Sequence, residues 1–212
     1  MSILRIRCSP QGLSSESYRL SERIIQRLQA NQPGDKLDVI DVDATRLPHA
    51  DSDYAAALSS PADPLDGQLE LGTLKESARQ IQLLTDASHL VLSTPMHNFT
   101  VPSSLKVWLD HVVRVRSTFR ITPEGKRGLL ANRPVYVAIA SGGAFSGDNA
   151  GQPDFLTPYL RHVLATIGLH QITFISVEGT ARGPEFLEAA RKRADAAIAA
   201  LSFSATQPAF AV

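Results

Sequence analysis

Four serines and a glycine stand between an apolar run and a helical pattern in the stretch CSPQGLSSES, residues 8–17. A turn of this kind leaves backbone N–H groups unpaired at the start of a helix, where the helix dipole favours an anion. The stretch lacks both the lysine of a nucleoside-triphosphate loop and the glycine spacing of a dinucleotide loop. We therefore expect Ser9, Ser15 and Ser17 to hold a monophosphate group, although serines here also act simply as helix caps.

A second candidate is the stretch PMHNF, which follows another apolar run. Its members are Pro95, Met96, His97, Asn98 and Phe99. A polarizable thioether, an amide and an aromatic ring suit a flat aromatic ligand, which packs on the apolar groups and meets the polar groups at its edge. Met96 and Phe99 taken singly are also ordinary core residues, so from this stretch alone both interpretations stand.

A third candidate is the stretch ASGGAFSGDNAG, residues 140–151, which contains Gly142, Gly143, Gly147 and Gly151. Glycines let a backbone approach a ligand closely, although they are also common in turns that bind nothing. Like the first two stretches, it follows a predicted strand. The three stretches act together only if the fold brings their strand ends to one place.

The pattern of apolar runs predicts how these stretches are positioned. Short β-prone runs predict strands over residues 3–8, 37–42, 89–94, 135–140 and 171–177. Amphipathic patterns predict helices over residues 17–28, 66–85, 102–115, 153–167 and 184–201, with prolines 102, 153 and 184 in first turns and Ser15 as the first N-cap. Strands that alternate with helices predict an α/β fold with a parallel sheet covered on both faces, in the strand order 2-1-3-4-5. Ligands of such sheets bind beyond the carboxyl ends of the strands where the order reverses, so the three stretches should meet there.

The length of the chain fits one domain over residues 1–203, followed by a frayed tail at 204–212. The connection at 43–65 is unusually long. It is either an insertion with a short helix at 54–58 or a loop that faces a partner.

The composition excludes several classes of protein. The 21 Lys and Arg residues balance the 21 Asp and Glu residues, so the chain lacks the basic excess of nucleic-acid-binding proteins. The single cysteine, Cys8, excludes an intrachain disulfide, which fits a reducing cytoplasm. No motif predicts a metal site. No apolar run approaches the ~20 residues of a membrane span and no signal peptide is evident, so we expect a soluble, cytoplasmic protein.

Together these motifs resemble the FMN-dependent NADH:quinone and azo-dye reductases. The resemblance covers residues 3–203, and its most specific element is the PMxNF pattern at 95–99 after the third strand. Further matching positions are Ser9, Ser15-Glu16-Ser17, Leu105-Lys106, Arg114, Thr118-Phe119, Gly142-Gly143, Ile167-Gly168 and Glu178-Gly179. The resemblance implies a flavodoxin-like three-layer sandwich and a homodimer with flavin sites at its interface. It also implies an enzyme that passes two electrons from NADH or NADPH through FMN to quinones or azo compounds, in a ping-pong cycle.

Carried over residue by residue, the resemblance assigns the cofactor-binding positions. They are Ser9, Ser15, Glu16 and Ser17 for the FMN phosphate, Pro95, Met96, His97, Asn98 and Phe99 for the isoalloxazine ring, and Ala140, Ser141, Gly142 and Gly143 for its far edge. His97 and Asn98 are the candidates for a catalytic contribution beside the ring. No metal is implied.

The chain departs from the family pattern at several positions. The family commonly has Gln in place of Glu16, Tyr in place of His97, Ser-Arg in place of Ala140-Ser141, and aromatic residues from the neighbouring subunit in place of Ile121 and Thr166. A carboxylate repels a phosphate, so we expect Glu16 to turn its side chain outward and leave the contacts to serines and main chain. His97 brings an imidazole, whose charge changes near neutral pH, either to the edge of the ring or into solvent.

Two other functions fit parts of the sequence. A flavodoxin-like electron carrier would share the fold, but such carriers usually present an acidic docking surface, whereas this chain is formally neutral. Asp110 and His111 near Ser103 and Ser104 suggest a serine hydrolase. Because no G-x-S-x-G elbow follows a predicted strand, the hydrolase is the weaker alternative.

Overall fold

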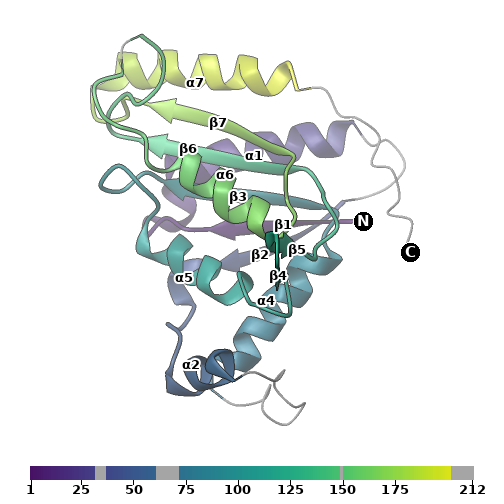
Figure 1. Ribbon diagram of the computed structural model, residues 1–212. Helices are drawn as coiled ribbons and strands as arrows, with labels where there is room; N and C mark the ends of the chain where they lie inside the picture. The colour runs from purple at the N-terminus through teal and green to yellow at the C-terminus, as the bar shows by residue number, and fades with distance from the viewer. Residues whose placement is uncertain (32–36, 61–71, 149, 202–212) are drawn as a thin grey trace.

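The computed structural model describes residues 1–31, 37–60, 72–148 and 150–201 of the chain. Its centre is a five-stranded sheet in the order β2-β1-β3-β6-β7, in which all neighbouring strands are parallel (Figure 1). The strands are β1 (Ser2–Arg7), β2 (Asp38–Asp43), β3 (His89–Pro95), β6 (Val135–Ser141) and β7 (Ile172–Glu178). Counted along the chain within this sheet, the order is 2-1-3-4-5, so the predicted topology is confirmed.

Helices cover both faces of this sheet. Within the described residues they are α1 (Glu16–Ala30), α2 (Ser52–Ser59), α4 (Leu74–Asp86), α5 (Ser103–Val112), α6 (Thr157–Thr166) and α7 (Pro184–Ala199), with short 3₁₀ turns η1 (Gly12–Ser14) and η2 (Ala44–Arg46). Helices α1 and α7 lie on one face, and α4, α5 and α6 lie on the other (Figure 1). These are the three layers that the sequence predicts.

Each face of the sheet carries its own hydrophobic core. Ile3 of β1 belongs to the cluster that contains Leu20 of α1, whereas the next residue, Leu4, belongs to the cluster that contains Trp108 of α5. Successive side chains of a strand point to opposite faces, so a strand buried on both faces needs an almost continuous apolar sequence. This requirement is why the sequence alone locates β1 and β3.

Two of the three proline assignments are wrong. Pro184 opens α7 as predicted, whereas Pro102 lies just before α5 as its N-cap residue. Pro153 lies outside α6, which begins at Thr157. The Asp154 carboxylate accepts a hydrogen bond from the Thr157 N–H group at 2.9 Å, and this contact fixes the start of the helix.

Two other helix boundaries differ from the prediction. Helix α5 ends at Val112 rather than at residue 115, because the Thr118 hydroxyl donates to the Val112 carbonyl at 2.6 Å and Arg116 adopts a left-handed conformation with φ 68°. The described part of the second long predicted helix begins at Leu74. Its predicted start at residue 66 lies outside the described residues, as does the predicted frayed tail at 204–212.

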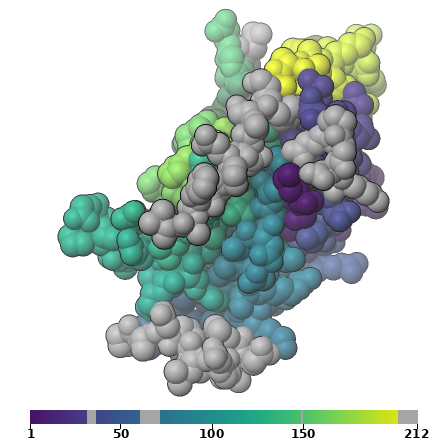
Figure 2. All heavy atoms as spheres, turned by 90° about the vertical axis from the view of Figure 1, so that its right-hand side faces the viewer, coloured from purple at the N-terminus to yellow at the C-terminus, as the bar shows by residue number. Residues whose placement is uncertain are grey.

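A β-hairpin between α5 and β6 was not predicted. Its strands, β4 (Phe119–Thr122) and β5 (Gly125–Gly128), pair with each other in an antiparallel ladder. The hairpin belongs to the teal segment that stands out from the body of the molecule at the left of Figure 2. Ile121 near its tip has 73% of its surface exposed.

The long connection after β2 contains a helix, as one of the two interpretations predicts. Helix α2 includes the predicted residues 54–58, and the Tyr54 hydroxyl donates to the Asp110 carbonyl of α5 at 2.5 Å. Residues 61–65 of the connection lie outside the described residues. Within the part of the chain that is described, no helix is long and apolar enough to cross a membrane.

Candidate functional site

The carboxyl ends of β1, β3 and β6 lie side by side at one edge of the sheet. Main-chain hydrogen bonds continue the pairing beyond the strands, because Cys8 N–H donates to Ser93 O at 2.9 Å. On the other side of β3, Met96 N–H donates to Ala140 O at 2.8 Å. The three stretches singled out in the sequence therefore begin next to one another, where the strand order reverses.

The serine turn surrounds the N-terminus of α1 with buried hydroxyl groups. Ser15 is the N-cap residue, because its Oγ accepts from Tyr18 N–H at 3.2 Å and donates to Gly12 O at 2.9 Å. Ser17 Oγ lies 3.4 Å from Ser15 Oγ. Ser9 stands at the start of the turn, and its carbonyl accepts from Gly12 N–H at 3.0 Å. Ser15 thus caps the helix, and three buried serines are grouped near the positive end of the α1 dipole.

Glu16, in the first turn of α1, directs its carboxylate toward two guanidinium groups. Arg191 of α7 contacts it at 2.6 and 3.0 Å, and Arg19 contacts it at 2.5 Å. Burial acts to raise the pKa of Glu16, but the hydrogen bonds from Arg191 and Arg19 outweigh it and lower the pKa below its usual value. The charge of Glu16 is therefore compensated by the protein itself.

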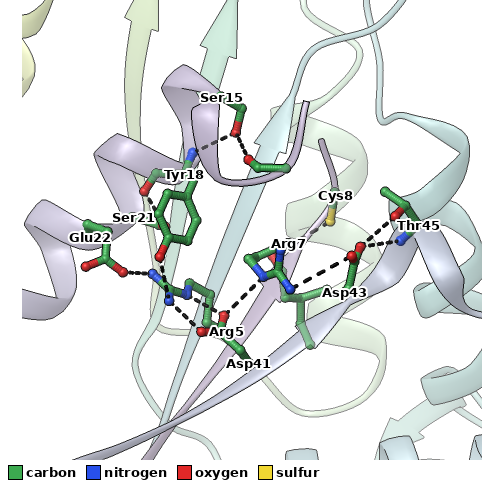
Figure 3. A network of polar contacts seen from close by, with 12 residues as sticks. Arg5, Arg7, Cys8, Ser15, Tyr18, Ser21, Glu22, Asp41, Asp43 and Thr45 are labelled. Atoms are coloured by element: carbon green, nitrogen blue, oxygen red, sulfur yellow. Dashed lines mark hydrogen bonds and ion pairs between the residues drawn. The ribbon is translucent and has the colours of Figure 1, made fainter. Parts of the chain in front are cut away.

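A buried arginine of β1 ties the same helix to the sheet (Figure 3). The Arg5 guanidinium donates to both carboxylate oxygens of Asp41 on β2, at 2.5 and 2.6 Å, and it also pairs with Glu22 of α1. Its central carbon lies 4.5 Å from the centre of the Tyr18 ring. Burial alone would lower the pKa of Arg5, but the bonds to Asp41 and Glu22 raise it, so the residue stays charged. The position of α1, and hence of the serine turn, is fixed by this network.

The stretch after β3 forms a tight turn with two strained residues. His97 and Thr100 exchange two main-chain hydrogen bonds of 3.0 Å, and the two central residues have positive φ angles, 47° for Asn98 and 69° for Phe99. For residues other than glycine this conformation costs about 1–2 kcal/mol each, and such strain clusters at functional sites. His97, Asn98 and Phe99 are exposed, whereas Met96 belongs to a core cluster. The core interpretation therefore holds for Met96 and fails for Phe99.

Glu178, at the end of β7, holds the glycine-rich stretch after β6. Its carboxylate accepts hydrogen bonds from Phe145 N–H at 2.7 Å, from Ser146 N–H at 3.1 Å and from the Ser146 hydroxyl at 2.6 Å. Burial acts to raise the pKa of Glu178, but these bonds and one from the Ser176 hydroxyl lower it overall. The loop is thus attached to the neighbouring strand by an ionised carboxylate.

Gln152 joins the second and third stretches. Its Nε2 lies 3.1 Å from Met96 Sδ and 3.1 Å from Ser141 Oγ. A methyl group at Gly143 would lie 2.3 Å from Gln152 Oε1, so only glycine leaves room for the amide. Neither Gln152 nor Glu178 was predicted as a site residue. A lone Gln in a loop carries no local signal, and the match of Glu178 to the family pattern did not indicate its contacts with the loop after β6.

The remaining departures from the family pattern lie outside the three stretches. Ile121 is on the projecting hairpin, and Thr166 is the last residue of α6, half-buried, with its hydroxyl bonded to the His162 carbonyl at 3.0 Å.

A hollow of about 610 Å³ lies along β7 and α7 and is lined by Ser146 and Glu178 among others. Its lining does not include the serine turn or Met96.

The geometry contradicts the serine-hydrolase alternative. His111 Nε2 lies 2.8 Å from the Pro48 carbonyl, whereas the Asp110 carboxylate pairs with Lys106 at 2.6 Å. The Ser104 hydroxyl donates to the Cys8 carbonyl at 2.6 Å. Each side chain is bonded to a different partner, so no triad forms. No group of three metal-ligating side chains is found in the described ranges either.

Known proteins resemble this chain in sequence and in structure. The sequence model of a protein family that is described as having a flavodoxin-like fold matches residues 1–201. An FMN-dependent NADH:quinone oxidoreductase of Pseudomonas fluorescens is 42% identical over 208 residues, which are 98% of this chain and 96% of the relative. Another FMN-dependent NADH:quinone oxidoreductase, from Burkholderia lata, is 42% identical over 192 residues, 89% of this chain and 90% of the relative.

Among solved structures, an FMN-dependent NADH-azoreductase of Bacillus anthracis in complex with FMN has the same fold. Its TM-score is 0.77 at 22% identity, over 93% of this chain and 97% of that one. This chain therefore belongs to the class of proteins with a flavodoxin-like fold. The chain belongs, within that fold, to the family of the FMN-dependent NADH:quinone oxidoreductases.

Proposed function

We propose that this enzyme binds FMN at the edge formed by the three stretches and uses it to transfer two electrons from a nicotinamide to a quinone or azo acceptor. The observation that carries the proposal is the grouping of three features at one edge. They are the buried serines around the N-terminus of α1, the strained turn after β3 and the glycine-rich loop after β6. The names of the relatives, FMN-dependent NADH:quinone oxidoreductase, support it independently.

The serine turn suits the phosphate end of FMN. The first N–H groups of α1 lack intrahelical acceptors, and the hydroxyl groups of Ser9, Ser15 and Ser17 lie beside them. To donate to a phosphate, the Ser15 hydroxyl would turn away from the Gly12 carbonyl. Each hydrogen bond to a charged phosphate contributes about 1.5–3 kcal/mol. Because the Glu16 carboxylate is occupied by arginines, we assign Glu16 a main-chain contact only.

The turn after β3 and the loop after β6 suit the ring end. The positive φ angles of Asn98 and Phe99 present main-chain groups at the tip of the turn, and Pro95, Met96 and His97 flank them. Ala140, Ser141, Gly142 and Gly143 approach from the neighbouring strand β6. A flat ring between these segments would meet backbone groups on its edges and apolar side chains along its face.

FMN, when bound, supplies hydride chemistry, and the protein's part is to orient the ring and to tune its surroundings. The exposed turn leaves one side of the proposed ring site open, which suits one planar partner at a time. We therefore propose a ping-pong cycle in which the nicotinamide leaves before the quinone or azo compound enters. His97, whose side chain is exposed at this turn, is the candidate to contact the acceptor beside the ring.

We further propose that the active protein is a cytoplasmic homodimer in which each hairpin contributes to the partner's site. The projecting hairpin with its exposed Ile121 supports this assignment (Figure 2). Sedimentation of the purified chain should give a dimer, and Ile121→Lys should shift it toward the monomer. An active monomer at nanomolar concentration would contradict the shared site.

Initial rates with NADH and a soluble quinone test the enzymatic proposal. A ping-pong enzyme gives parallel lines in double-reciprocal plots at several quinone concentrations. Intersecting lines would reject the ping-pong cycle. A chain that binds FMN but consumes NADH only when a protein redox partner is present would be an electron carrier instead.

A further inference from the structure

Gln152 bridges two separate loops from the inside. It lies in the segment between β6 and α6, and its amide nitrogen is within 3.1 Å of Met96 Sδ and of Ser141 Oγ. Met96 is 8% exposed and Ser141 is 3% exposed, so the bridge lies in a largely buried position. Ser141 Oγ and Met96 Sδ are 3.9 Å apart, which completes a compact cluster of three side chains.

The two partners of Gln152 stand at the base of the proposed ring site. Met96 is the residue between β3 and the strained turn, and Ser141 is the last residue of β6, directly before Gly142. A methionine side chain has three rotatable bonds, so without a partner its thioether would sample several positions. An amide that donates to the sulfur selects one of them.

The chain also leaves room for the amide. Any side chain at Gly143 would collide with Gln152 Oε1, at 2.3 Å from an added methyl carbon. The neighbouring Gly151 N–H donates to the Ala144 carbonyl at 2.9 Å, so the loop closes on itself and carries Gln152 inward. Both features direct one polar side chain to a place between the loops.

We infer that Gln152 is a positioning residue for the flavin ring: it fixes the Met96 thioether and couples the turn after β3 to the loop after β6. This inference rests on the proposed function, because it assigns the ring to these loops. Gln152 need not touch the cofactor. Its effect passes through Met96 and Ser141.

Methionine methyl NMR on the full-length chain tests the bridge without relying on activity. The chain has two methionines, Met1 and Met96, of which Met1 is 64% exposed, so their methyl signals are readily distinguished. In Gln152→Leu, which keeps a similar volume but removes the donor, the Met96 signal should move toward the position of a freely rotating methionine. The matched control is Gln82→Leu, an exposed glutamine of α4 whose amide bonds Asp86, and it should leave the signal in place.

FMN titrations of the same proteins test the consequence for the ring. Loss of one hydrogen bond that organises the site should weaken FMN binding about threefold to tenfold in Gln152→Leu and shift the visible absorption bands of the bound flavin. Gln82→Leu should match the wild type in both measurements. Gly143→Ala, which displaces the amide, should move the Met96 signal in the same direction as Gln152→Leu and add little to it in the double variant.

The outcomes separate the two claims. An unchanged Met96 signal in Gln152→Leu would show that the bridge does not hold the thioether. A shifted Met96 signal with unchanged FMN affinity and flavin spectrum would show that Gln152 only packs the loop, and the inference would be wrong. If the wild-type chain binds no FMN, the proposed function fails, whatever the methyl signals show.

Discussion

Arg191 on α7 holds the carboxylate of Glu16 on α1 through two hydrogen bonds of 2.6 and 3.0 Å. Glu16 is an acidic residue in the first turn of α1, and this pair binds its carboxylate to the neighbouring helix α7. The sequence predicts that Glu16 must avoid a bound phosphate. In the structure its carboxylate is committed to Arg191 and Arg19.

Replacing Glu16 by glutamine should strengthen FMN binding. Arg191 and Arg19 lose their compensating carboxylate, and about 1 kcal/mol of added attraction between these guanidinium groups and the phosphate across solvent corresponds to roughly fivefold tighter binding. The α1–α7 contact weakens at the same time, by less than about 1 kcal/mol because Arg191 is partly exposed. Fluorescence titration with FMN measures the first effect. Glu76→Gln, which removes a carboxylate paired with Arg79 on α4, is the control. Weaker FMN binding in Glu16→Gln would show that Glu16 helps to hold the cofactor.

Removing the hydroxyls of Ser15 and Ser17 together should release FMN. Two bonds to a charged phosphate are lost, which corresponds to at least roughly 100-fold weaker binding. Ser14→Ala is a matched control, because Ser14 lies in the same turn but is exposed and bonds only the Gln11 carbonyl at 2.8 Å. Because Ser15 also caps α1, circular dichroism must show that the helix content is kept. Wild-type affinity for FMN in the double variant would show that the phosphate binds elsewhere.

Glu178 should make the loop after β6 sensitive to acid. Its pKa is lowered in the folded protein, so its contribution to stability is fully present above the unfolded pKa of about 4.3 and is lost as the pH falls through the lower folded value. Urea unfolding should therefore show Glu178→Gln as less stable than the wild type at pH about 7, with the difference shrinking below pH about 4. A difference that stays constant over this range would mean that ionisation of Glu178 contributes nothing.

His97 should shape the choice of acceptor but not cofactor binding. The side chain is exposed at a turn that would meet the flavin through main-chain groups, so His97→Tyr should keep its full FMN content. The relative rates with different quinones should change, because a phenol differs from an imidazole in size and polarity at the open side of the proposed ring site. Identical acceptor preferences in the two proteins would mean that the imidazole only faces solvent. Loss of FMN would instead make the side chain part of the binding site.

The fold was predictable where a strand is buried on both faces, because the resulting apolar runs need no partner to be recognised. The hairpin was not, since its strands are four residues each and carry Arg120, Lys126 and Arg127, and no short apolar run marks it. The serine turn was predictable from composition. Gln152 and Glu178 were not, because their roles depend on residues that are distant in sequence, such as Met96 and Phe145.

The central claim is that this chain passes electrons from a nicotinamide to an acceptor through FMN bound at the three-stretch edge. Anaerobic mixing of the FMN-loaded protein with one equivalent of NADH, followed by a quinone, tests it most directly. NADH alone should bleach the visible absorption of the flavin completely, and the quinone should then restore it in a separate second phase. Flavin absorption that stays unchanged with NADH, while the protein retains its FMN, would contradict electron transfer through FMN.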